Sequence, residues 1–90
     1  GGGRGGADGE WDIVCVSADR KHVFLGECKW MQSVTSAKVV ATIRVMKRRE
    51  EPPVPVGATV HYGLFLPDGG NLPAELDGVS LLDAARVVGN

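Results

Sequence analysis

Two runs near the amino end constrain the fold most, because both are rich in the β-branched and aromatic residues that favour strands. They span residues 10–16 and 22–29, and the polar segment between them is suited to a turn. Together they predict a β-hairpin. If residues 18–21 form a four-residue loop, Ser17 faces His22, and this pair fixes the register of both strands.

This register places four charged side chains on one face of the hairpin. Asp12 lies opposite Glu27, and Glu10 lies opposite Lys29; residues two apart in a strand share a face, so all four project to the same side. Opposed Cβ atoms are about 4.5–5.5 Å apart, so one divalent cation could bridge the two carboxylates. Magnesium takes such oxygen ligands. The other face is wholly apolar, with Trp11, Ile13 and Cys15 against Cys28, Gly26 and Phe24.

At these residues the sequence resembles a known nuclease superfamily. Asp12 followed by Glu27-Cys28-Lys29 is similar to the core motif of the PD-(D/E)XK nucleases. The longer strings Glu10-x-Asp12-Ile13-Val14 and Gly26-Glu27-Cys28-Lys29-Trp30 resemble the uncharacterised domain found carboxy-terminal to archaeal-type ATPase modules. The resemblance implies an α/β fold with a restriction-endonuclease-like mixed sheet flanked by helices. It also implies DNA as a substrate, Mg²⁺ or Mn²⁺ as a cofactor, and a linked or associated ATPase module.

The resemblance implies catalytic roles for Asp12, Glu27 and Lys29. The two carboxylates would bind the metal together with the backbone carbonyl of Cys28, and Glu10 would be a secondary ligand. The metal would lower the pKa of a bound water, and Lys29 would orient that water or stabilise developing charge. The residues by themselves leave a plainer alternative open. Glu10 and Lys29 could form a cross-strand ion pair worth about 0.2–1 kcal/mol, with the other two carboxylates in solvent.

Residues 33–51 predict a helix, with a strand as the alternative because many of its residues are β-branched. Its cap would be Ser33, Thr35 or Ser36. The predicted apolar stripe runs through Val34, Ala37, Ala41, Val45 and Arg48, widened by Val40, Ile43 and Met46.

The remainder of the chain completes the predicted order β-β-α-β-(α)-β-α. Three prolines predict an extended connector over 50–57, and 59–66 predicts an interior strand. The last predicted elements are a short helix at 71–76, a strand at 79–82 and a helix at 84–88 capped by Asp83.

The predicted domain spans residues 10–90, after a flexible lead-in of nine residues that include six glycines. Members of the resembled family place a helix with a further acidic residue before this point. The sequence contains none there, so the chain is either an excised fragment or carries an incomplete site.

Composition adds few constraints on function. The 90 residues carry a formal net charge of −1, with 43% hydrophobic and 23% charged residues, which fits one small globular domain. A nucleic-acid-binding domain is commonly basic, so the composition does not indicate one. A weak signal for nucleic-acid contact comes from Gln32, Lys47, Arg48 and Arg49, with an exposed glutamine as the alternative for Gln32. A solvated helix end is the alternative for the three basic residues. A non-catalytic nucleic-acid-binding or protein-interaction module is therefore the alternative function.

No apolar run approaches the roughly 18 residues of a membrane span, so the expected location is cytoplasmic with no membrane partner. A homodimer is a further possible assembly.

The remaining chemistry-bearing residues receive structural assignments. Cys15 and Cys28 are diagonal in the register, which predicts two buried free thiols and no disulfide. There is no Cys-x-x-Cys and no histidine pair at ligand spacing, so no zinc site is expected, and His22 and His61 are assigned to structure. Trp30 is assigned to core packing.

Overall fold

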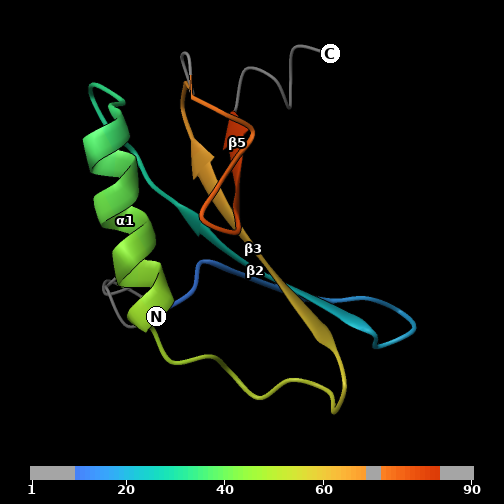
Figure 1. Cartoon of the computed structure of the whole chain (residues 1–90). Helices are drawn as coiled ribbons and strands as arrows, with labels where there is room; N and C mark the ends of the chain where they lie inside the picture. Colours follow the sequence, from blue (N-terminus) through green and yellow to red (C-terminus); the bar gives the residue numbers. More distant parts are fainter. Residues whose placement is uncertain (1–9, 69–71, 84–90) are drawn as a thin grey trace.

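The computed structural model describes residues 10–68 and 72–83 as a mixed five-stranded sheet with a helix along one side (Figure 1). The strand order across the sheet is β1-β2-β3-β5-β4. The elements are β1 (Ile13–Val16), β2 (His22–Cys28), α1 (Ser36–Arg48), β3 (Thr59–Leu66), β4 (Glu75–Leu76) and β5 (Val79–Asp83). The predicted lead-in at 1–9 and the predicted helix at 84–88 lie outside the described residues.

The β1–β2 hairpin has the predicted register. Its antiparallel ladder runs from Ile13 opposite Gly26 to Val16 opposite Val23. The Ser17 N–H donates to the His22 carbonyl at 2.9 Å, which closes the loop over residues 18–21 as expected. However, β1 begins at Ile13 and not at residue 10, so the two acidic residues before it lie outside the ladder.

Helix α1 is confirmed, and the strand alternative for this segment is wrong. Thr35, one of the three predicted caps, accepts a hydrogen bond from the Lys38 N–H at 3.2 Å. The predicted apolar stripe is confirmed only in part, because Ile43 and Met46 are buried whereas Ala37, Ala41 and Arg48 are exposed. The buried residues are Val39, Thr42, Ile43 and Met46. Apolar side chains lie on most sides of this helix, so periodicity alone did not decide which side meets the sheet.

The centre of the sheet is parallel. β3 lies between β2 and β5 and is parallel to both, which confirms the interior strand predicted at 59–66. A parallel neighbour requires a crossover, and α1 with the irregular connector 49–58 supplies it (Figure 1). The buried core lies between α1 and the facing side of the sheet, and includes Leu25, Leu64 and Leu81. Within the part of the chain that the structure describes, no helix has the length and apolar character needed to cross a membrane.

A second hairpin replaces the short helix predicted over 71–76. β4 pairs antiparallel with β5, with Leu76 opposite Val79. Asp77 and Gly78 between them have φ of 53° and 80°, as a two-residue type I′ turn requires. The Asp-Gly pair between apolar residues is a strong hairpin signal, and the sequence interpretation overlooked it. β5 also extends to Asp83, one residue beyond the predicted strand.

The face of the sheet away from α1 is organised by Phe24. Its ring lies over two paired glycines: a Cβ added to Gly63 would be 2.4 Å from Phe24 Cζ, and one added to Gly26 would be 2.9 Å from Phe24 Cε2. Phe65 meets the same ring edge-on, with centroids 6.3 Å apart. The glycines are therefore needed for the close approach of an aromatic ring to the backbone.

We expect Gly63→Ala to lower the free energy of unfolding by about 1–3 kcal/mol, because the new methyl group displaces the Phe24 ring. Urea denaturation followed by tryptophan fluorescence measures the change. The matched control is the same substitution in a Phe24→Leu background, where the loss should be much smaller. Equal losses in the two backgrounds would show that the ring is not the cause.

Candidate active site

The predicted site residues lie at one edge of the sheet. Asp12 immediately precedes β1, Glu27 is the second-last residue of β2, and Lys29 follows that strand. β2, β3 and β5 are parallel, so their carboxyl ends meet at this edge. In open α/β sheets ligands bind outside the carboxyl ends of the strands. The structure therefore places Asp12, Glu27 and Lys29 at the same end of the β1–β2 hairpin.

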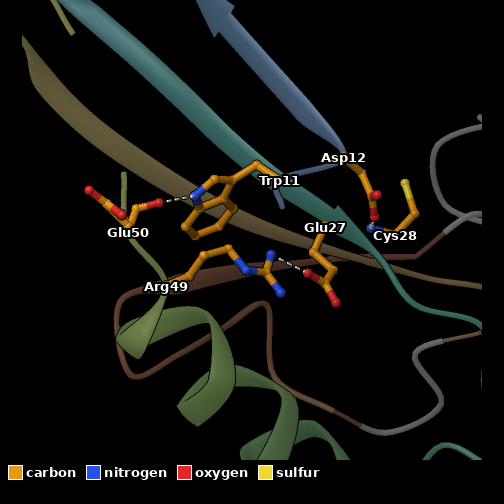
Figure 2. Close-up of polar contacts among 6 residues, drawn as sticks. All are labelled: Trp11, Asp12, Glu27, Cys28, Arg49 and Glu50. Carbon is orange, nitrogen blue, oxygen red and sulfur yellow. Dashed lines mark hydrogen bonds and ion pairs between the residues drawn. The ribbon is translucent and has the colours of Figure 1, made fainter. Parts of the chain in front are cut away.

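Asp12 is held by a local irregularity of β1. Its N–H donates to the Gly26 carbonyl at 3.0 Å, although Gly26 is already the ladder partner of Ile13. Two residues thus oppose one, as in a β-bulge. The exposed carboxylate turns to the end of β2, where its Oδ2 accepts a hydrogen bond from the Cys28 N–H at 2.8 Å (Figure 2). Asp12 is therefore fixed beside Cys28 and is not a ladder partner of Glu27.

The bulge also corrects the predicted position of Trp11. The register placed Trp11 on the face of Ile13 and Cys15, away from the acidic residues. In the structure it packs against the core under α1, with its ring centroid 5.9 Å from that of Tyr62. The extra residue at the bulge changes the alternation of side chains, so Trp11 lies on the same face as Glu27 (Figure 2).

Glu27 is a buried carboxylate with a cationic partner. The residue is 5% exposed, and its Oε1 accepts a hydrogen bond from Arg49 Nη1 at 2.5 Å. Arg49 is 8% exposed, and its guanidinium also lies 4.9 Å from the Trp11 ring centroid (Figure 2). The prediction that Arg49 contacts nucleic acid is therefore wrong, because its charged group is engaged inside the protein. Gln32, Lys47 and Arg48 are exposed.

Three consecutive residues after α1 bind to the sheet or to Trp11, which precedes β1. Besides Arg49, the Glu50 carbonyl accepts a hydrogen bond from Trp11 Nε1 at 3.1 Å, and the Glu51 carboxylate accepts one from the Tyr62 hydroxyl. The hydrogen bond to Glu51, with smaller effects of burial and of the Glu51 charge, raises the pKa of Tyr62 to about 12. These contacts fix the end of the helix beside Glu27.

Lys29 immediately follows β2 and lies beside the end of β3. Its N–H donates to the Phe65 carbonyl at 2.9 Å, and its side chain is exposed. Lys29 and Glu27 line one cavity of about 220 Å³, together with Ala41, Thr42 and Val45 of α1. The cavity is large enough for several water molecules next to the buried carboxylate.

Three assignments to the core are wrong. Trp30 is 80% exposed, and Cys15 and Cys28 are exposed free thiols. Both cysteines lie on the side of the sheet that α1 does not cover, which explains their exposure. Although Cys28 is exposed, partial desolvation by the surrounding atoms, followed by the negative charges of Asp12 and Glu27, raises the pKa of its thiol. The absence of a disulfide is confirmed.

The donor chemistry around Cys28 fits a hard divalent cation. The two carboxylates of Asp12 and Glu27 and the carbonyl of Cys28 are all oxygen ligands of the type that Mg²⁺ takes, with water in the remaining positions. Residues 10–68 and 72–83 contain no group of three or more His, Cys, Asp or Glu side chains already gathered to hold a metal. A cation at Glu27 would have to share or replace the guanidinium of Arg49.

The fold and this edge define a small α/β domain with a mixed sheet and acidic side chains at the ends of its strands. No protein-family model, curated protein or solved structure matches the chain. The resemblance to PD-(D/E)XK nucleases therefore rests on the motif residues themselves.

Removal of its cation tests the buried ion pair between Glu27 and Arg49. Arg49→Met should lower the free energy of unfolding by about 3–5 kcal/mol, because it leaves the buried Glu27 carboxylate without its cation. The double variant Glu27→Leu/Arg49→Met removes both charges and should recover most of that loss. Guanidinium chloride denaturation of both variants provides the measurement. A double variant no more stable than Arg49→Met would contradict the role given to charge pairing.

The second prediction concerns Tyr62, the single tyrosine of the chain. Its pKa near 12 exceeds the ordinary value of about 10, so the folded state favours the neutral phenol. The contribution of Tyr62 to the free energy of unfolding is therefore fully present below pH 10, and it is lost as the pH rises from 10 to 12. Absorbance at 295 nm should show a native midpoint near pH 12, and Glu51→Gln should shift it toward 10. A midpoint unaffected by Glu51→Gln would exclude that carboxylate as the cause.

Proposed function

We propose that this domain is a metal-dependent DNA nuclease that hydrolyses phosphodiester bonds. The observation that carries the proposal is the position of Asp12, Glu27 and Lys29 at the same end of the β1–β2 hairpin, with the Asp12 carboxylate fixed at 2.8 Å from the Cys28 nitrogen. The sequence resemblance assigns the same three residues to catalysis. A linked or associated ATPase module is the partner that this resemblance implies.

Asp12, Glu27 and the Cys28 carbonyl would hold Mg²⁺ or Mn²⁺, with Glu10 as a secondary ligand. When bound, the ion supplies a water of lowered pKa and positive charge next to the phosphate. The ammonium group of Lys29, two residues from Glu27, orients the attacking water or stabilises charge on the phosphate oxygens. Its exposure keeps it accessible to a substrate outside the strand ends. Arg48, exposed at the end of α1, is available for contacts with a DNA backbone, and Lys47 beside it is exposed with its Nζ 4.0 Å from Asp77 Oδ1.

The Glu27 carboxylate of the proposed site has two alternative partners, the guanidinium of Arg49 and a metal ion. With its guanidinium on Glu27, the buried carboxylate is neutralised without a metal ion. Binding of a cation at Glu27 requires that this contact loosen, because two positive charges on one carboxylate repel each other. Metal affinity should therefore be lower than for an unpaired carboxylate site.

The same ion pair supports a second candidate, a non-catalytic nucleic-acid-binding or protein-interaction module of the same fold. In that case Glu27 serves the packing of α1 against β2, and the exposed residues of the edge meet a partner. The two candidates differ in one measurable property, the cleavage of DNA in the presence of Mg²⁺.

We expect the chain to cleave plasmid or branched DNA only with Mg²⁺ or Mn²⁺, and we expect Lys29→Ala and Asp12→Asn to lower the rate on the order of a hundredfold or more. Both side chains are exposed, so neither substitution should unfold the domain. The matched control is Lys21→Ala, which removes the same charge near the other end of β2. Binding of DNA without cleavage would favour the second candidate.

Calorimetry tests the metal site separately from the reaction. Titration with Mg²⁺ or Mn²⁺ should give a heat of binding that Asp12→Ala abolishes or strongly reduces, because one of two carboxylate ligands is lost. An unchanged heat in Asp12→Ala would remove this residue from the metal site.

A further inference from the structure

Two histidines that are 39 positions apart in the sequence meet on the sheet. Nδ1 of His22 lies 3.0 Å from Nε2 of His61, and the ring centroids are 5.2 Å apart. His22 is the first residue of β2 and pairs with Thr59, whereas His61 lies two residues further along β3. Residues two apart share a face of a strand, so the parallel register places both rings on the side away from α1. Both side chains are exposed.

The separation of the two nitrogens fits two neighbouring positions around a metal ion. When the two rings turn their lone pairs toward one first-row ion and keep this 3.0 Å separation, bonds of about 2.0–2.1 Å from each nitrogen to the ion enclose an angle of roughly 90–100°. This is the angle between adjacent ligands in square-planar and octahedral coordination, and it is smaller than the tetrahedral angle. Those geometries are preferred by Cu²⁺ and Ni²⁺.

We propose that His22 and His61 form a bidentate site for a divalent transition ion with right-angled coordination, such as Ni²⁺ or Cu²⁺, with water in the remaining positions. In the hydrogen-bonded pair one ring nitrogen donates to the other. In the complex both of these nitrogens present lone pairs, and each neutral ring carries its proton on its other nitrogen. The exposed rings can turn to make this exchange, and solvent can carry the proton.

The site is independent of the proposed nuclease function. His22 and Glu27 are five residues apart in an extended strand, which separates them by about 16 Å. The ligand types also differ, since imidazole suits nickel and copper whereas the carboxylates of the strand ends suit magnesium. An ion at the histidines would link β2 and β3 at the edge opposite the candidate active site.

Calorimetric titration of the untagged chain with Ni²⁺ tests the proposal. We expect His22→Asn and His61→Asn each to weaken binding on the order of tenfold or more, because the second ligand of the ion is lost and with it the advantage of two linked ligands. The double variant should bind no more tightly than either single variant, because no imidazole ligand remains. Binding elsewhere, including at the amino terminus, is common to all variants and therefore cancels. Equal affinities in the unmodified chain and the double variant would overturn the site.

Proton NMR locates the ion without any substitution, because these two histidines are the only ones in the sequence. Substoichiometric Ni²⁺, which is paramagnetic, should broaden the ring signals of both histidines together. The melting temperature should rise with Ni²⁺ in the unmodified chain and not in the double variant, since the ion binds the folded pair. Broadening of one ring alone, or of neither, would overturn the proposal.

Discussion

The contact between Glu27 and Arg49 is the constraint on which the arrangement of helix and sheet depends. A carboxylate in β2 and a guanidinium just after α1 are both nearly inaccessible to water, so each requires the other. A buried ion pair adds little net stability relative to an apolar pair. A buried charge left without its partner, however, is strongly unfavourable. The pair therefore acts on specificity: it excludes positions of α1 along the sheet in which Arg49 does not reach Glu27.

The neighbouring contacts extend this constraint to the connector. The Trp11 ring covers the guanidinium and binds the Glu50 carbonyl, while Tyr62 binds Glu51. The ten-residue connector 49–58, which has no regular structure, therefore leaves the end of α1 in a fixed direction and then reaches β3. Trp11 can take part only because the bulge at Asp12 changes the side of the sheet on which it lies. The same bulge fixes the Asp12 carboxylate beside Cys28, so one irregularity of β1 serves both the packing and the candidate site.

Local features of the sequence predicted the parts of the fold that depend on local physics. The hairpin register followed from a four-residue loop, the helix cap was among the Ser and Thr residues considered, and the apolar run 59–66 was an interior strand. The Asp77-Gly78 turn was equally local and could have been predicted. The buried side of α1 could not be predicted in this way, because apolar residues occur on most sides of the helix. Which of those sides is buried depends on how the helix packs on the sheet. The bulge is likewise invisible in the alternation of residues 10–16.

The sequence motif identified the acidic residues Asp12 and Glu27 at the carboxyl end of β2, but it did not identify partners that come from distant segments. Arg49 reaches Glu27 across 22 positions, and His22 reaches His61 across 39, in both cases through the crossover that makes β2 and β3 parallel. A cation at Glu27 must compete with a guanidinium whose chain neighbours are bound to Trp11 and Tyr62. Occupation of the site by a metal would therefore be coupled to the position of the carboxyl end of α1, where Lys47 and Arg48 are exposed.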